Sequence, residues 1–455
     1  MGESAKIVEA MRAAVPAARP ALDDTEASVL RDLTGQLIEK RPEATAEYRR
    51  FRDIANRELC LPEDRVRDRL AQAAIVVTGG TGCIGSALMT QIAARRPARL
   101  VSVSRGITSG WPRQASAEYR HADITEPAAV RRLIAEIRPD VIFHVAAQRS
   151  PALAETEVHR TVSVNVLGAR NVLTAAADSG VPQVVCASTG KALRPYSPDV
   201  YTASKRAAEW LSTTIATTSG TLCSAARFTH VADNSIIHQR LLTWARARAN
   251  GAMRLHGAEI AFYVQSAVES AQLLLVAMLG AVPGEFRVHA ISDLGWPVSL
   301  LDVAVGVLRE TRSDTPLYFS GYDPGYEEVA FPGLYDPATA GDVSPLLNAF
   351  EAAAAVPAPC PRTDSFRLEM APDPVPPKLL EALGEVCART RDDNAVRRAL
   401  DELSWSLLDA TLAAADRDAL ARCAALVRRH EETMSPVHRR IARTVARRCM
   451  PAALL

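Results

Sequence analysis

Two residues of this sequence, Tyr201 and Lys205, have the types and the spacing that proton transfer to or from a hydroxyl requires. They open a predicted helix, and a separation of four residues puts both side chains on one helical face. A tyrosine titrates near pH ~10, but a neighbouring ammonium favours the phenolate, so Tyr201 is expected to act as a base near neutrality. Ser188 and Thr189, which end a predicted strand just upstream, are expected to hydrogen-bond the substrate oxygen.

A glycine-rich segment, TGGTGCIG at 78–85, joins a predicted strand to a predicted helix. Glycine permits the tight turn and leaves room for a pyrophosphate, and the helix N-terminus supplies N–H groups and positive potential to that anion. An ordinary glycine turn is the alternative, but both flanking elements are those that dinucleotide binding requires. We therefore predict that a dinucleotide is bound by Gly79, Thr81, Gly82, Cys83, Ile84 and Gly85.

The residues that end the next predicted strands indicate which dinucleotide is bound. The second strand ends in Ser104 and Arg105, where an acidic residue would be expected to bind the ribose 2′-hydroxyl of NAD. A guanidinium suits a 2′-phosphate, so NADP is favoured and NAD is the alternative. The remaining cofactor-binding residues are expected to be Asp123 and Ile124 at the adenine, Ala146 and Ala147 after the fourth strand, and Tyr201 and Lys205 at the nicotinamide.

The elements that must position these residues alternate from Ala73 onward between short apolar runs and amphipathic segments. Such alternation, with nearly unbroken apolar strands, predicts an α/β fold with a Rossmann-type, doubly wound parallel sheet and a small substrate lobe. Helical patterns predict extensions at both ends. The predicted boundaries are a helical N-terminal extension at 1–72, the NADP-binding core with its interleaved substrate lobe at 73–335, a Pro-rich linker at 336–376 and a helical C-terminal bundle at 377–455.

Together these motifs resemble the extended short-chain dehydrogenase/reductase superfamily, and within it the nucleotide-sugar 4,6-dehydratases and epimerases of capsular polysaccharide biosynthesis. The matching segments are TGGTGCIG (78–85), SVSRG (102–106), HADI (121–124), IFHVAAQRSPALAE (142–155), NVLGARNV (165–172), STGKA (188–192), YTASKRAAE (201–209), ARFTHVADNSII (226–237) and AFYVQSAVESAQLLL (261–275). The resemblance implies that Tyr201 removes the C4 hydroxyl proton while the C4 hydride passes to NADP or NAD, which leaves a 4-keto sugar. It also implies that dehydratases use an acidic residue to expel the C6 hydroxyl and a base to take the C5 proton.

The sequence departs from this family directly after Thr189. Where dehydratases have Ser-Thr-Asp-Lys, this chain has Ser-Thr-Gly-Lys, so Gly190 replaces the acid while Lys191 keeps the position of the base. Because glycine has no proton to give, the sequence favours epimerisation or net redox chemistry over ordinary 4,6-dehydration. Asp199 and His230 are alternative acids, and a salt bridge or phosphate contact is the alternative role of Lys191. The expected substrate residues are Arg149, His230 and Asn234.

Composition limits the other function classes. A net charge of +1 and eight scattered cysteines without a CxxC pair argue against a nucleic-acid partner and against a metal site. The longest apolar stretch, at 271–282, is shorter than the ~20 residues that a membrane span needs. Without a signal-peptide pattern, we expect a cytoplasmic protein with no membrane partner. The extension at 1–72 is expected to pack on the core or on a second subunit, and we expect a homodimer.

Three functions are consistent with these residues. The first is an NAD(P)-dependent enzyme that modifies a nucleotide sugar through a transient 4-keto intermediate. The second is an NADP-dependent ketoreductase or dehydrogenase on a non-sugar metabolite, which would release its cofactor at each turnover. The third is a cofactor-binding scaffold without turnover, against which the intact Thr189, Tyr201 and Lys205 argue.

Overall fold

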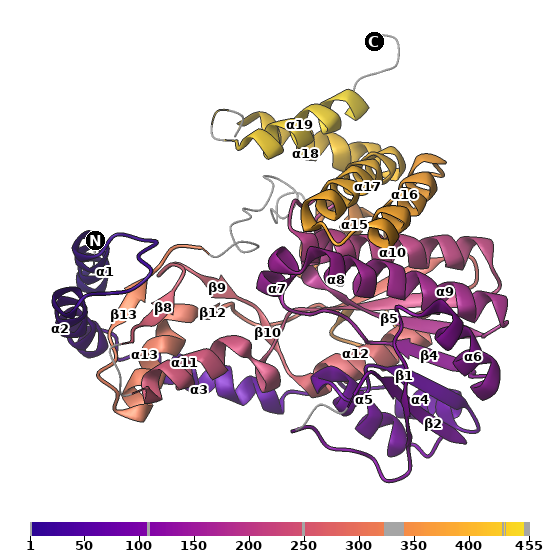
Figure 1. Ribbon diagram of the computed structural model, residues 1–455, viewed down its shortest axis with the longest axis horizontal. Coiled ribbons are helices and arrows are strands. Elements are labelled where there is room, and N and C mark those ends of the chain that lie inside the picture. Colours follow the sequence, from indigo (N-terminus) through magenta and orange to yellow (C-terminus); the bar gives the residue numbers. More distant parts are fainter. Residues whose placement is uncertain are drawn as a thin grey trace. The chain divides into compact units, whose positions relative to one another are not determined.

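The computed structural model describes residues 2–106, 110–247, 251–322, 341–429, 432 and 434–449. The chain forms two compact units (Figure 1). The larger unit comprises 59–229, 268–293 and 328–455, and the smaller unit comprises 1–58, 230–267 and 294–327. The smaller unit is therefore assembled from the N-terminal segment and two insertions into the larger one.

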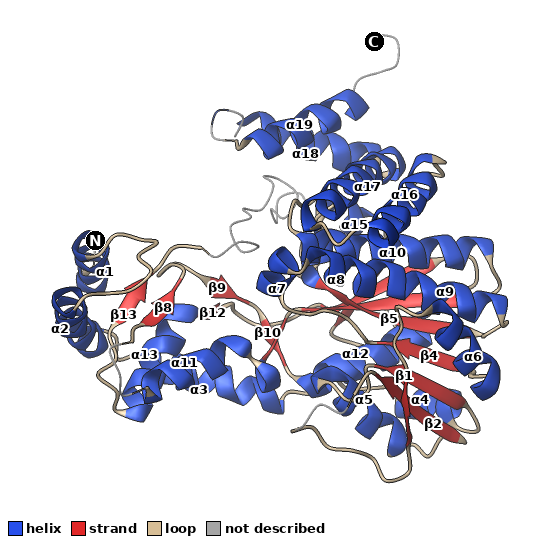
Figure 2. Ribbon diagram, in the orientation of Figure 1, coloured by secondary structure: helices blue, strands red, loops and turns tan. Residues whose placement is uncertain are grey.

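A nine-stranded sheet lies at the centre of the larger unit (Figure 2). Its order is β14-β15-β11-β6-β5-β4-β1-β2-β3, and every pairing from β3 to β11 is parallel. The order 3-2-1-4-5-6 within it is that of dinucleotide-binding folds and confirms the predicted Rossmann-type sheet. The strands are β1 (Ala74–Thr78), β2 (Arg99–Ser104), β3 (Glu118–His121), β4 (Val141–His144), β5 (Gln183–Thr189), β6 (Leu222–Phe228), β11 (Phe286–Ile291), β14 (Ala355–Val356) and β15 (Thr363–Arg367).

Helices cover both faces of this sheet. On β5, the Cys186 sulfur accepts a hydrogen bond from Ser212 of α10, whereas the Gln183 amide donates to the Met278 carbonyl of α12. Because residues an odd number of positions apart on a strand point to opposite faces, α10 and α12 cover opposite faces. The helices of this unit up to α12 are α4 (Glu63–Leu70), α5 (Cys83–Ala93), α6 (Pro127–Ile137), α7 (Pro151–Thr156), α8 (Val158–Val162), the π-helix η2 (Ser163–Gly168), α9 (Ala169–Asp178), η3 (Gly190–Leu193), α10 (Val200–Thr218) and α12 (Ala267–Gly280).

The segment at 336–376, for which the sequence predicted a linker, contributes regular structure to the larger unit. Within its described part, α15 (Ala349–Ala353) is followed by β14 and β15, and β15 pairs antiparallel with β11. The prolines of the described part lie before, between and after β14 and β15, so none interrupts either strand. Phe366 of β15 is fully buried, so this strand extends the core rather than bridging two domains.

Four C-terminal helices also belong to the larger unit: α16 (Val375–Arg389), α17 (Asp393–Ala414), α18 (Arg417–Arg429) and α19 (Pro436–Cys449). Helix α17 packs on α8, α10 and α16, and α18 packs on α15 and α19 (Figure 1). One core cluster joins Leu408 and Cys423 of these helices to Tyr196 and Phe350 of the preceding segments. The C-terminal helices therefore share a hydrophobic core with the Rossmann-type part. None of the described helices is both long and apolar enough to span a membrane.

The smaller unit has its own hydrophobic core, to which the N-terminal helices contribute. A Cβ at Gly306 of α13 would overlap the Tyr48 side chain, so glycine allows α3 to pack closely against α13. The segment 1–72, predicted as one N-terminal extension, is therefore shared between the two units, because 59–72 belongs to the larger one. The elements are α1 (Glu3–Ala14), α2 (Asp24–Lys40), α3 (Ala44–Asp53), η1 (Ile54–Asn56), β7 (His230–Val231), η4 (Ala232–Asn234), α11 (Ile236–Arg246), β8 (Met253–Leu255), β9 (Ala261–Phe262), β10 (Val264–Gln265), β12 (Val298–Ser299), α13 (Leu300–Thr311) and β13 (Leu317–Phe319).

Candidate active site

The glycine-rich turn lies between β1 and α5, beside the point where the strand order reverses. Gly79 has a φ of 75°, and a Cβ there would lie 2.8 Å from the backbone nitrogen of Ala146. A Cβ at Gly85 would overlap the carbonyl oxygen of Gly79. Within the described residues no side chain caps α5, whose N-cap is Gly82. The turn therefore has the close backbone packing and the uncapped helix N-terminus that suit a pyrophosphate.

Two hydroxyls fix the loop that follows β2. Thr81 and Ser104 both donate to the carbonyl oxygen of Gly106, at 3.2 and 2.8 Å. Arg105 is half exposed, and its Nη1 lies 3.8 Å from an oxygen of Asp123. The structure thus brings Arg105 and Asp123 together at the end of the sheet where an adenosine ribose would lie. Cys83 and Ile84 lie in the first turn of α5.

Ile124, one of the residues expected at the adenine, packs against Gly168 of η2. Ile124 is buried, and a Cβ at Gly168 of η2 would lie 2.9 Å from its Cδ1. Its carbonyl accepts a hydrogen bond from the Asn171 amide at 3.0 Å. After β4, the Ala146 N–H donates to the Thr78 hydroxyl at 3.4 Å, while Ala147 is exposed.

Lys205 lies at the carboxyl ends of three neighbouring strands. Its Nζ donates to the Ala187 carbonyl of β5 at 2.6 Å, and its side chain is buried. Burial lowers the pKa of Lys205 below its ordinary value. His144 of β4 bonds the Thr78 hydroxyl of β1 at 2.8 Å, and burial, with a smaller effect of Lys205, lowers its pKa to about 3. His144 is therefore neutral at physiological pH, and Lys205 is the basic group at this position.

Tyr201 is the second residue of α10 and is half-buried. Asp199 caps this helix by accepting from the Thr202 N–H at 3.0 Å and the Thr202 hydroxyl at 2.9 Å. The same carboxylate accepts from the Lys191 ammonium at 3.2 Å. The cap therefore fixes the turn that carries Tyr201 and holds Lys191 beside it. Both oxygens of Asp199 thus act as acceptors, in the helix cap and in the ion pair with Lys191.

Ser188 and Thr189 are turned away from each other because they are adjacent on a strand. The Ser188 hydroxyl is buried and donates to Glu209 of α10 at 2.6 Å. The Thr189 side chain points to the face of β5 opposite Ser188, and its Oγ1 accepts from the Lys191 N–H at 3.3 Å. The structure thus brings Thr189, Lys191, Tyr201 and Lys205 to one region, whereas Ser188 belongs to the contacts beneath it.

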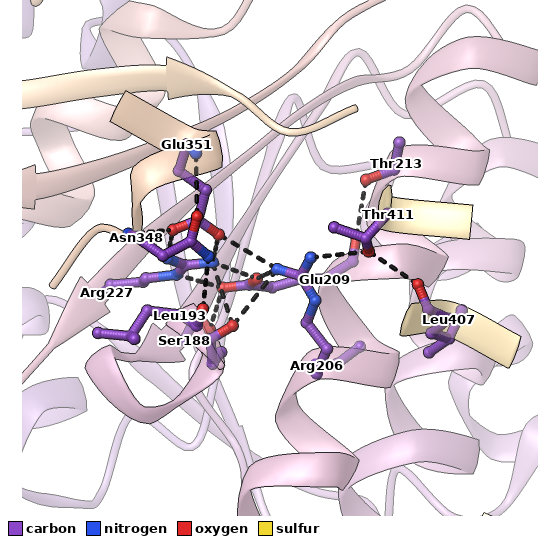
Figure 3. Close-up of polar contacts among 12 residues, drawn as sticks. Ser188, Leu193, Arg206, Glu209, Thr213, Arg227, Asn348, Glu351, Leu407 and Thr411 are labelled. Atoms are coloured by element: carbon purple, nitrogen blue, oxygen red, sulfur yellow. Dashed lines mark hydrogen bonds and ion pairs between the residues drawn. The ribbon is translucent and has the colours of Figure 1, made fainter. Parts of the chain in front are cut away.

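Those contacts form a buried charged network (Figure 3). Glu209 pairs with Arg227 of β6 at 2.8 Å and with Arg206 at 3.4 Å. Glu351 of α15 pairs with Arg227 at 2.7 Å and with Arg206 at 3.3 Å. Burial acts to raise the pKa of Glu209, but Arg227 and Arg206 outweigh it and hold that pKa below its ordinary value. Two carboxylates and two guanidiniums therefore link the Tyr–Lys helix to α15.

Gly190 packs against the segment that leads into α15. A Cβ on Gly190 would lie 2.6 Å from Cδ2 of Leu346, a buried residue just before α15. The space beside residue 190 is therefore filled by an apolar side chain. An aspartate in place of Gly190 would displace Leu346, so the departure from the Ser-Thr-Asp-Lys pattern has a packing counterpart in the chain.

The expected substrate residues fall in both units. Arg149 follows β4 in the larger unit and is exposed. His230 on β7 and Asn234 on η4 belong to the smaller unit. His230 bonds the Ser235 hydroxyl at 2.7 Å, and burial lowers its pKa to about 4. A neutral imidazole at physiological pH does not fit the role of replacement acid.

A family described as "Polysaccharide biosynthesis protein" matches residues 75–330. The chain belongs to this family. A stretch of 279 residues is 29% identical to the capsular polysaccharide biosynthesis protein CapD of Staphylococcus aureus, covering 57% of this chain and 45% of that protein. A stretch of 113 residues is 30% identical to the dTDP-L-rhamnose 4-epimerase of Burkholderia thailandensis, covering 24% of this chain and 31% of that enzyme.

The fold of this family member has solved counterparts. The structure of Pen from Bacillus thuringiensis superposes with a TM-score of 0.55 at 21% identity, covering 66% of this chain and 87% of that one. This similarity supports the Rossmann-type assignment. The chain spans less than half the length of the curated relatives described above. The C-terminal helices α16–α19 lie outside the residues that the family matches.

Asn165, on the π-helix η2, was missed by sequence reasoning. Its amide nitrogen donates to the Gln148 carbonyl and the Ser204 hydroxyl, and its oxygen accepts from the Gln148 N–H. Ser204 in turn donates to the Tyr201 carbonyl at 2.8 Å. Asn165 thus joins the loop after β4 to the Tyr–Lys turn, and π-helical turns are frequent at functional sites. The available signal was a buried amide within the apolar stretch VSVNVLGA.

Proposed function

We propose that this chain is an NADP-dependent enzyme that epimerises or reversibly oxidises a nucleotide sugar through a transient 4-keto intermediate. The observation that carries the proposal is the position of Lys205, buried at the carboxyl end of β5 and one helical turn from Tyr201. Family membership and the named activity of the dTDP-sugar relative support the substrate class. The chain's partial coverage of those relatives is the reason for a direct test of activity.

The residues of the β1–α5 turn fit a bound dinucleotide. Gly79 and Gly85 occupy positions where a side chain would meet backbone atoms, and α5 begins without a side-chain cap. Arg105 supplies a half-exposed guanidinium for a 2′-phosphate, the basis for proposing NADP with NAD as the alternative. When bound, the nicotinamide would accept the C4 hydride and return it.

The proton steps are assigned to this chain's own side chains. Tyr201 takes the C4 hydroxyl proton, and Lys205 stabilises the resulting phenolate because its ammonium lies on the same helical face. Lys205 is oriented by the Ala187 carbonyl, and Tyr201 by the Asp199-capped first turn of α10. Thr189, the last residue of β5, is assigned to hydrogen-bond the reacting oxygen.

The packing at Gly190 supports epimerisation or redox chemistry over 4,6-dehydration. Leu346 fills the space beside residue 190, so expulsion of the C6 hydroxyl has no acid at this position. Asp199 is held as an acceptor, and His230 is neutral at physiological pH. Lys191, paired with Asp199, is assigned to orient the sugar or its phosphates, with proton removal beside the ketone as its alternative role.

The test is turnover in deuterium oxide on dTDP-glucose and UDP-N-acetylglucosamine with NADP, followed by NMR and mass spectrometry. We expect a C4 epimer or 4-keto product without loss of water, and no turnover by Tyr201→Phe. A product that has lost water would show that the enzyme dehydrates the sugar and would contradict this expectation. Stoichiometric release of NADPH on a non-sugar alcohol would favour the ketoreductase alternative. Equal activity of Tyr201→Phe would overturn the proposal.

A further inference from the structure

Helix α17 contacts the Tyr–Lys segment at three places, although it lies outside the residues that the family matches. It packs along α8 and α10 within the larger unit (Figure 1). Its polar side chains contact Tyr196, before the Tyr–Lys pair, and Arg206, directly after Lys205. Another contact reaches the start of α10 indirectly, through Glu155 of α7. The three contacts therefore bracket the pair from both sides.

The first contact runs through Glu155 of α7. Arg397 of α17 donates to one carboxylate oxygen of Glu155 at 2.5 Å and to its carbonyl at 3.0 Å. The other carboxylate oxygen of Glu155 accepts from the Val200 N–H at 2.8 Å. Val200 is the first residue of α10 and precedes Tyr201. The Glu155 side chain is only 10% exposed, so Arg397 is the cation that fixes a carboxylate on the N-terminus of this helix.

The second contact fixes the loop that joins Lys191 to Asp199. The Tyr196 hydroxyl donates to Asp401 of α17 at 2.6 Å, and its ring stacks on Trp405 with centroids 3.9 Å apart. Burial, with a smaller effect of Asp401, raises the pKa of Tyr196, so its hydroxyl stays a donor through the physiological range. Arg440 of α19 lies 3.7 Å above the Trp405 ring. The loop is therefore held by a side chain that is anchored between two C-terminal helices.

The third contact follows Lys205. Arg206 donates to the Thr411 hydroxyl of α17 at 3.1 Å and is itself part of the buried network with Glu209 (Figure 3). Its side chain is 3% exposed. The position of α10 along α17 is thus set by polar contacts about four helical turns apart on α17, from Arg397 to Thr411.

We infer that Arg397 is a positioning residue. Through Glu155 and the Val200 N–H it holds the first turn of α10, which carries Tyr201, in place. Tyr196 and Asp401 secure the preceding loop in the same way. The C-terminal helices thereby complete the catalytic arrangement that the Rossmann-type part supplies. This inference rests on the proposed function, because it assigns the contacts to the placement of one phenol.

The experiment compares full-length Arg397→Gln, Arg397→Lys, Arg389→Gln and Tyr201→Phe, loaded with NADP and assayed on dTDP-glucose and UDP-N-acetylglucosamine. Arg389 is the matched control, since it is an exposed arginine of α16 that pairs with Glu385. We expect Arg397→Gln to lower kcat at least about tenfold, because small displacements of a reacting group are costly. KM and the NADPH dissociation constant should change less than about twofold. The ascending limb of the pH–rate profile should move to higher pH, and Arg397→Lys should restore part of kcat.

The outcomes separate the inference from the proposed function. Turnover by Tyr201→Phe would contradict the proposed function itself. An inactive Tyr201→Phe beside an Arg397→Gln with wild-type kcat and pH profile would overturn the positioning role alone. So would a loss of kcat that only follows the loss of folded protein in circular dichroism. Tyr196→Phe repeats the test at the second contact if Arg397→Gln does not fold, with the same expected shift of kcat and pH profile.

Discussion

Leu346 occupies the space that a side chain on residue 190 would need, with its Cδ2 2.6 Å from the position of a Cβ there. Gly190→Ala is therefore expected to lower the free energy of unfolding by about 1–3 kcal/mol through overpacking. The buried Leu346 can yield only by displacing its neighbours. Urea unfolding of the variant measures the effect.

The matching test is a double-mutant cycle. Leu346→Ala alone is expected to be destabilising, by about 2–5 kcal/mol for a buried leucine. In the double variant Gly190→Ala/Leu346→Ala the added methyl should be tolerated, so the two effects should not add. Strict additivity would show that the two side chains do not compete for the same space.

The buried network predicts a large effect of removing one carboxylate. Glu351→Gln leaves Arg227 and Arg206 with one anionic partner fewer, and such a change is expected to cost about 3–5 kcal/mol of stability. The exposed pair of Glu385 and Arg389 is the control, because Glu385→Gln should cost no more than about 1 kcal/mol. Chemical denaturation of both variants measures the difference. Similar small losses would mean that the network contributes little to folding.

His289 predicts a pH dependence of stability. It is buried on β11, bonds the Ser365 hydroxyl at 2.7 Å, and burial lowers its pKa from 6.5 to about 3. Between these values the unfolded state binds a proton that the folded state does not, so stability falls as the pH falls from 6.5 towards 3. His289→Gln should reduce this slope by up to about 1.4 kcal/mol per pH unit. The exposed His121→Gln is the control, and an unchanged slope in His289→Gln would refute the assignment.

Arg105 predicts the cofactor preference. Arg105→Ser should weaken NADPH binding about tenfold or more while NADH binding stays nearly unchanged, because a guanidinium bonds the 2′-phosphate that NADH lacks. Fluorescence titration with both dinucleotides measures the two constants. Arg99→Gln, at an arginine of β2 that pairs with Glu118, is the control. Equal losses for NADPH and NADH, or tighter NADH binding by the wild type, would favour NAD.

Sequence reasoning succeeded where local signals agreed with the fold. The short strand-like runs predicted β1 to β5, and the glycine turn was placed between β1 and α5. It failed where a long-range contact decides the structure. No local pattern indicates that β15 pairs with β11, or that the Ser188 hydroxyl donates to Glu209.

The same limit applies to the ends of the chain. The helical character of 1–72 and 377–455 was readable from amphipathic spacing, but their partners were not. Arg397 is an ordinary helix-surface arginine in the sequence, and only the structure places it on Glu155, two contacts away from Tyr201. The Asn165 bonds to Ser204 and Gln148 likewise depend on a π-helical turn that no sequence pattern indicated.

The proposed mechanism requires that the Tyr201 hydroxyl ionises beside Lys205. The direct measurement is an ultraviolet pH titration of the NADP-loaded protein, with the Tyr201→Phe variant as the difference reference. The account predicts one phenol that ionises well below the usual pH ~10, absent in Tyr201→Phe and shifted upward in Lys205→Met. If the difference spectrum shows no ionisation below that pH, the phenol of residue 201 is not the base.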